Sequence, residues 1–175
     1  MSDSGRPHGC RTRVLNSMTA YSLLLRKDLR EPLLAAHWPD DVTLATLDPQ
    51  WLPQAHTLLS QAYRCGKGSV ESLQHWQHAL MHDAEYDPQL CFAFLRKGQV
   101  IAFAQAWTSA FLRDLAVHPD HQRRGLGDAL LSHVFAAFEQ RREPYVDLKV
   151  MEHNHTALRL YQKHGMTVVQ RERVL

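Results

Sequence analysis

The chain has 175 residues, about the length of one domain, and its 45% apolar and 22% charged residues are ordinary for a globular protein. A formal net charge of +2 gives no electrostatic reason to expect nucleic-acid binding or attachment to a membrane surface. No apolar run approaches the roughly 20 residues of a membrane-spanning helix. The three cysteines have no CxxC spacing, which argues against a disulfide framework or a zinc ribbon and favours a reducing, cytoplasmic location.

Residues 1–40 carry little regular pattern. The first part is polar, without an apolar segment of signal-peptide length, and is expected to be a flexible leader; Met1 and Met18 both remain open as the start. The rest is expected to be a transitional segment, in which residues 21–25 and 33–38 could each pack on a core. The folded domain is expected to span residues 41–175.

From residue 41 the apolar pattern alternates between the periods of strands and helices. We expect helices that end near residues 63, 83, 141 and 164, and strands at 42–47, 90–95, 100–107, 111–118, 145–150 and 166–174. The order β-α-α-β-β-β-α-β-α-β predicts an α/β fold, with a single mixed central sheet flanked by helices.

A polar turn between the strand at 111–118 and the next helix is typical of an anion site. Gly125 and Gly127 lack a Cβ, so a pyrophosphate can approach the backbone where the first N–H groups of the helix are unpaired. Arg123 and Arg124 add positive charge there. By itself, a GxG turn is more often structural. A nucleotide P-loop and a Rossmann fingerprint both fail, the latter because Leu130 stands where a glycine is needed.

Two blocks of sequence resemble the GCN5-related N-acetyltransferase (GNAT) superfamily. The first matches its signature between a strand and a helix and reads Gln122-Arg123-Arg124-Gly125-Leu126-Gly127. The second is a strand followed by an Asn and a helix that ends at a glycine, here Leu148-Lys149-Val150, Asn154, Ala157, Leu160-Tyr161 and Gly165-Met166. Both occur in the family's order, and the clear match covers roughly residues 100–166.

The resemblance implies the GNAT fold and direct transfer of an acetyl group from acetyl-CoA to a small-molecule or peptide amine, without a metal. It implies that Tyr161 protonates the departing CoA thiolate. It further implies cofactor contacts by the phosphate turn, the preceding strand and one asparagine: Arg123, Arg124, Gly125, Leu126, Gly127, Asp128, Leu115, Ala116, Val117 and Asn154. A non-catalytic acetyl-CoA sensor and transfer of a longer acyl group remain alternatives.

The strand before the turn departs from the family pattern. Some members carry a general base on the face shared with Leu115 and Val117, where alternation places Phe111 and Arg113 in this chain. Neither is a plausible base. Asp114 is expected on the opposite face and is not assigned the role.

The base therefore stays open between a water chain and a residue of another segment, such as Glu71, His75 or Glu152. Arg113 is expected to face the acceptor cleft and to favour an acceptor that carries a carboxylate or phosphate.

The C-terminal end is short for the family. After the second block, residues 166–175 suffice for one strand, where the family commonly has two. A missing strand would leave an open sheet edge, which a homodimer could cover. His75, His78 and His82 share one helical face, but no acidic or cysteine partner with metal-ligand spacing joins them, so no metal site is expected.

Overall fold

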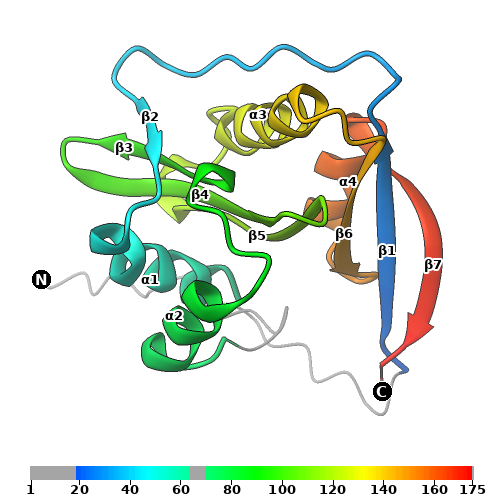
Figure 1. Ribbon diagram of the computed structural model, residues 1–175, viewed down its shortest axis with the longest axis horizontal. Helices are drawn as coiled ribbons and strands as arrows, with labels where there is room; N and C mark the ends of the chain where they lie inside the picture. The colour runs from blue at the N-terminus through cyan, green and yellow to red at the C-terminus, as the bar shows by residue number, and fades with distance from the viewer. Residues whose placement is uncertain (1–18, 64–69, 175) are drawn as a thin grey trace, which may run out of the picture.

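The computed structural model describes residues 19–63 and 70–174, which form one seven-stranded mixed sheet in the order β2-β3-β4-β5-β6-β1-β7 (Figure 1). Only the β5–β6 pairing is parallel. The strands are β1 (Tyr21–Asp28), β2 (Thr43–Thr46), β3 (Cys91–Arg96), β4 (Gln99–Trp107), β5 (Phe111–Val117), β6 (Tyr145–Met151) and β7 (Thr167–Arg173). The helices are α1 (Leu52–Tyr63), α2 (Leu73–His82), α3 (Leu126–Gln140) and α4 (His155–Lys163). The short 3₁₀ helices are η1 (Pro49–Trp51), η2 (Pro88–Leu90) and η3 (Pro119–His121).

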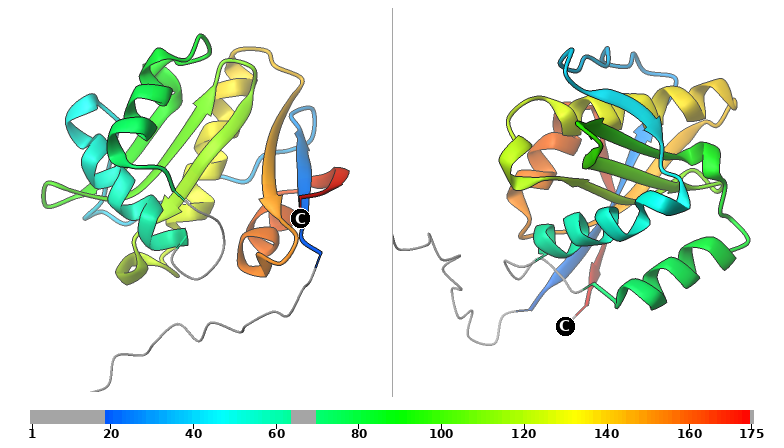
Figure 2. Two further views of the ribbon diagram at one scale, coloured as in Figure 1. Left: turned by 90° about the horizontal axis from the view of Figure 1, so that it is seen from below. Right: turned by 90° about the vertical axis from the view of Figure 1, so that its left-hand side faces the viewer.

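Helices cover both faces of the sheet, as Figure 2 shows. Under α1 and α2 lies a core that includes Leu59, Trp76 and Phe103. Under α3 and α4 lies a larger core that includes Phe94 and Phe135. Because β4 is buried along nearly its whole length, it separates the two cores and anchors β5 from one side. The expected α/β fold with one mixed sheet is confirmed.

Strand β1 is the main difference from the sequence expectation. It lies between β6 and β7, antiparallel to both, with Leu23 and Leu25 buried. Arg26 donates two hydrogen bonds of 2.8 and 2.9 Å to the carboxylate of Asp147 on β6. A run of three leucines followed by Arg-Lys-Asp does not have the alternation of a half-buried strand. For this reason the sequence pattern did not predict β1. A domain limit at residue 41 therefore leaves out one strand of the sheet, and the expected leader at 1–18 lies outside the described residues.

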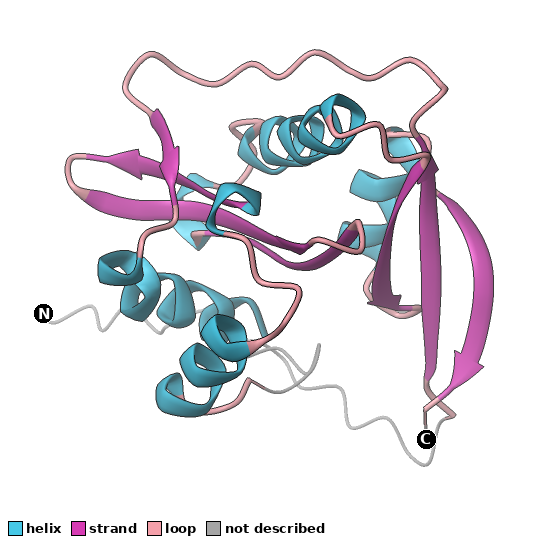
Figure 3. Ribbon diagram, in the orientation of Figure 1, coloured by secondary structure: helices cyan, strands magenta, loops and turns pink. Residues whose placement is uncertain are grey.

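The segment between β1 and β2 is a long loop that crosses above α3 (Figure 3). Leu33 and Trp38 pack against the larger core, and the Trp38 ring lies 5.3 Å from that of Phe94, centroid to centroid. The proline-rich stretch thus packs on a core without regular structure.

The single expected strand after α4 is confirmed as β7, whose only partner among the described strands is β1. An N-terminal strand thus takes the place beside β6, and β7 forms the sheet edge with Val168 and Val169 exposed. A homodimer across this edge stays a prediction. No helix of the described ranges is long and apolar enough to cross a membrane.

Candidate active site

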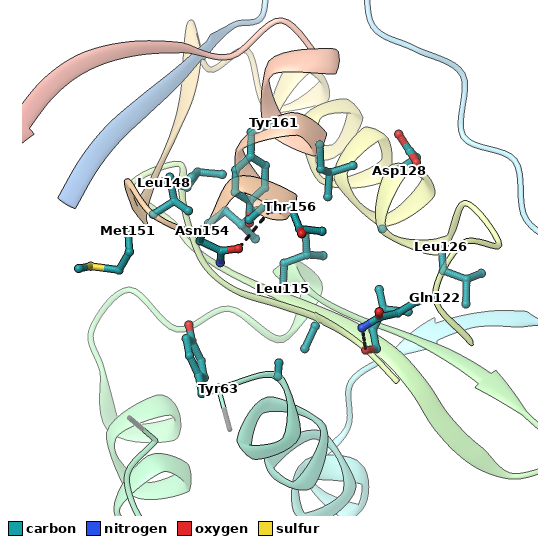
Figure 4. A pocket seen from close by; sticks show the side chains of 18 of the residues that line it. Tyr63, Leu115, Gln122, Leu126, Asp128, Leu148, Met151, Asn154, Thr156 and Tyr161 are labelled. Atoms are coloured by element: carbon teal, nitrogen blue, oxygen red, sulfur yellow. Dashed lines mark hydrogen bonds between the residues drawn. The ribbon is translucent and has the colours of Figure 1, made fainter. Parts of the chain in front are cut away.

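Strands β5 and β6 separate soon after they begin to pair. Their pairing runs through Phe111–Asp147 and Leu112–Leu148, and the strands then diverge. A cavity of about 590 Å³ opens beyond this point, lined by Leu115, Ala116 and Val117 of β5, by the turn after it and by α4 (Figure 4). Since β4 pairs with only one side of these three residues, their main chain is free of strand pairing on the cavity side.

The turn after β5 forms one end of the cavity. Arg123 and Gly125 have φ angles of +66° and +77°, and Gly125 caps α3 without a side chain, so the first N–H groups of that 15-residue helix stay open. A Cβ on Gly127 would lie 3.4 Å from Leu160 of α4, which is ordinary van der Waals contact, so α4 packs directly beside this turn. The site fits a pyrophosphate, because unpaired N–H groups and the helix dipole favour an anion.

Not every side chain expected at this turn reaches the cavity. Arg123 lines it, but the Arg124 guanidinium instead donates to Asp41, at 2.8 Å, just before β2. Asp41 also accepts from Arg96 at 2.7 Å, and these two cations hold the pKa of its carboxyl below the usual range. The turn is thus tied by its second arginine to β3 and the long loop.

Asp128 lines the cavity while joining α3 to the end of α4. One carboxylate oxygen lies 2.9 Å from Lys163 Nζ and 2.9 Å from His164 Nε2. Burial raises the pKa of Asp128, but these two hydrogen bonds outweigh burial and the pKa is lowered. The carboxylate of Asp128 therefore links α3 to the end of α4.

Tyr161 of α4 and Tyr63 at the end of α1 point toward each other across the other end of the cavity (Figure 4). Burial, together with Tyr63 and the carboxyl of Asp114, raises the pKa of Tyr161 well above its usual value. Its hydroxyl is therefore protonated at neutral pH, as a proton donor must be.

Asn154 lies at the N-terminus of α4 and lines the same cavity. Its side-chain oxygen accepts a hydrogen bond of 3.3 Å from the N–H of Ala157, which makes it the N-cap of the helix. The amide nitrogen takes no part in that cap.

Residues 52–166 match the model of the Acetyltransferase (GNAT) family, which is well over half of the chain. The chain belongs to this family. The GNAT family implies acetyl-CoA as cosubstrate, and the chain is an N-acetyltransferase of this kind.

Known relatives support the assignment. The [ribosomal protein bS18]-alanine N-acetyltransferase of Escherichia coli K12 is 29% identical over 126 residues, 70% of this chain and 79% of that protein. A mycothiol acetyltransferase of Acidothermus cellulolyticus is 28% identical over 169 residues, 82% of this chain and 50% of that protein. The solved GCN5-related N-acetyltransferase of Sphaerobacter thermophilus superposes with a TM-score of 0.72 at 24% identity, over 89% of this chain and 50% of that one. This GNAT chain thus spans about half the length of the last two proteins.

The side chains on β5 do not follow the alternation expected for this GNAT chain. The register between β4 and β5 shifts between Gln105 and Ala106. Gln105 pairs with Asp114 and Ala106 pairs with Leu112, so Arg113 has no partner residue on β4. As a result Leu112, and not Phe111, lies in the same core as Leu115, so placing residue 111 on that face was wrong. Arg113 nevertheless lines the cavity, as expected, with its guanidinium 5.3 Å from the Trp107 ring centroid.

Two of the suggested bases have other surroundings. The carboxylate of Glu152 accepts hydrogen bonds of 2.6 and 2.9 Å from Arg171, and His75 lies on an exposed part of α2. The imidazole rings of His78 and His82 stack on each other, with their centroids 4.1 Å apart. Among the described residues, no three His, Cys, Asp or Glu side chains group as metal ligands would.

Sequence reasoning missed Tyr63 and set aside Asp114. Tyr63 ends a helix with no motif around it, and only the packing of α1 against β5 brings it to the cavity. Asp114 is buried on the face of β5 that α1 and α2 cover. A charged residue in a largely apolar strand was the sequence signal that could have identified Asp114.

Proposed function

We propose that the chain transfers the acetyl group of acetyl-CoA directly to an amine in the cleft between β5 and β6. The observation that carries this proposal is one cavity with the phosphate-binding turn at one end and the phenol of Tyr161 at the other.

The expected cofactor residues are arranged for distinct parts of acetyl-CoA. Main-chain N–H groups from Arg123 to Asp128 would hold the pyrophosphate, with the Arg123 side chain beside them. The open main chain of Leu115, Ala116 and Val117 would pair with the pantetheine arm. The free amide of Asn154 would contact the same arm.

Acetyl-CoA supplies a thioester that a neutral amine can attack. A main-chain N–H near Val117 would polarise the thioester carbonyl, as donors of an oxyanion hole do. Tyr161 would then protonate the departing thiolate, because its hydroxyl is protonated and is directed into the cavity.

The acceptor would enter from the side of α1, where Tyr63 and Arg113 line the cavity. The guanidinium of Arg113 supports an acceptor with a carboxylate or phosphate near the amine. Protein alanine and mycothiol, named for the two relatives, belong to different acceptor classes. Both small-molecule and peptide amines are therefore included in the test.

The test is release of free CoA thiol in the presence of acetyl-CoA and a set of amines: an alanine-initiated peptide, a lysine-containing peptide, a polyamine and an amino sugar. We expect thiol release above the amine-free rate with at least one of them. Acetyl-CoA binding without amine-dependent release from any amine class would contradict the proposal and favour a sensor.

A further inference from the structure

Tyr63 is the last residue of α1, and its hydroxyl points into the cavity toward the phenol of Tyr161 (Figure 4). The ring packs against the core under α1 and α2, which holds the side chain in place. The hydroxyl makes no hydrogen bond to any residue that the structure describes. A phenol that is partly buried usually has a hydrogen-bond partner, so this one is available to a ligand in the cavity.

The two phenols of the cavity come from opposite faces of the sheet. Tyr161 packs on the core under α3 and α4, the face that carries the phosphate-binding turn, and Tyr63 packs on the core under α1 and α2. The cavity opens where β5 and β6 separate, so it reaches both faces. Since the phosphates of the cofactor would lie at the turn, the end beside α1 is left for the acceptor.

Few side-chain oxygens of the lining are open to an amine at this end. Among the described residues, Tyr63 has the only side-chain oxygen that α1 or α2 contributes to the lining. Arg113 lies within its electrostatic reach but can only donate hydrogen bonds. On the cofactor side, the carboxylate of Asp128 already binds the end of α4, and the side-chain oxygen of Asn154 caps that helix. An amine that enters beside α1 therefore meets the oxygen of Tyr63.

We propose that the phenol oxygen of Tyr63 accepts a hydrogen bond from the amino group of the acceptor and fixes that nitrogen in front of the thioester. This inference rests on the proposed function. Burial, with the carboxyl of Asp114, raises the pKa of Tyr63 despite the nearby guanidinium of Arg113. The phenol therefore stays neutral and takes up no proton. One N–H of the amine is directed to the phenol, and the nitrogen lone pair is left for the acetyl carbon.

The two phenols differ in the step that each one affects. Tyr161 acts when the thiolate departs, so loss of its hydroxyl lowers kcat. Tyr63 contacts the amine as soon as the acceptor binds, so loss of its hydroxyl weakens acceptor binding before any bond is broken. A binding measurement without acetyl transfer can therefore isolate the contribution of Tyr63.

The test measures the Kd of two ligands for the chain saturated with CoA, which has no acetyl group to transfer. One ligand is the amine from the above set that the wild type acetylates fastest, and the other is the same molecule with a methyl group in place of the reactive amino group. Tyr63→Phe keeps the ring and removes the hydroxyl. We expect it to raise the Kd of the amine about 3- to 10-fold, the size of one hydrogen bond, and that of the methyl analogue less than about twofold.

Tyr86→Phe is the matched control, because Tyr86 packs against the same core but does not line the cavity, and it should leave both Kd values unchanged. A Tyr63→Phe chain that binds the amine as tightly as the wild type would overturn the inference. So would an equal loss for the amine and the methyl analogue, since Tyr63 would then be a wall of the cavity without a contact to nitrogen. Absence of wild-type transfer to every amine would instead remove the proposed function itself, and the inference with it.

Discussion

Leu112 of β5 pairs with Leu148 of β6, and beyond this pair the two parallel strands separate into the walls of the cavity. The separation exposes main-chain groups of β5 that a continuous sheet would satisfy. The same strand carries Arg113 and Asp114 at the place where its register with β4 shifts. The open wall of the cavity and the two charged residues therefore begin at the same point of β5.

The two arginines of the turn should differ in their effect on cofactor binding. Arg123→Gln removes a cation that lines the cavity, and a charged hydrogen bond to phosphate of about 1.5–3 kcal/mol corresponds to an increase of about 10- to 100-fold in the Kd for acetyl-CoA. Arg124→Gln is the control, since its guanidinium already binds Asp41. Calorimetric titration measures both, and an equal or larger effect of Arg124→Gln would contradict the placement of the two side chains.

Arg113 should select acceptors by charge. Arg113→Ala should raise KM about tenfold or more for amines that carry a carboxylate or phosphate, and leave other amines nearly unchanged. Arg113→Lys keeps the charge but loses the planar fork, so it should recover part of the effect. An unchanged KM for acidic acceptors in Arg113→Ala would rule out this recognition.

Asp114 should make the stability of the fold depend on pH. Its pKa of about 6 in the folded chain lies above the ordinary 3.8, so the folded state binds more protons between these values and loses stability as pH rises through them. Ionisation of this buried group costs about 3 kcal/mol relative to its neutral form.

Asp114→Asn has no such titration. Its free energy of unfolding, minus that of the wild type, should therefore increase by up to about 3 kcal/mol between about pH 4 and pH 8, measured by urea unfolding. A difference independent of pH would show that Asp114 is not perturbed.

Leu25 should report whether β1 belongs to the folded sheet. Its side chain is 0% exposed, so Leu25→Ala should lower the free energy of unfolding by about 2–5 kcal/mol. Leu34→Ala removes the same atoms from a side chain that is 47% exposed, and should change stability by about 0.5 kcal/mol or less. Equal effects of the two substitutions in urea unfolding would place β1 outside the cooperative fold.

The sequence indicated the elements from residue 41 onward because their apolar periods are long and regular. It did not indicate β1, whose partners β6 and β7 lie more than 110 residues away along the chain. Local pattern carries no information about such pairing. The N-terminal limit of the domain was therefore set too late to include this strand.

Within the site, motif residues were easier to find than the residues around them. The turn and Tyr161 lie in blocks whose order is informative, and the structure brings them to one cavity. The shift of register at Arg113 and the ion pair of Arg124 with Asp41 depend on packing between distant segments. Simple alternation along β5 could not anticipate either of them.

The most direct test of acetyl transfer in this cleft is Tyr161→Phe, with kcat measured by thiol release and the Kd for acetyl-CoA by titration. The phenyl ring keeps the packing of α4 and loses only the proton donor. We expect kcat to fall about 10²-fold or more while Kd changes by less than about threefold. A kcat equal to that of the wild type would contradict the role of Tyr161 as the acid and the mechanism built on it.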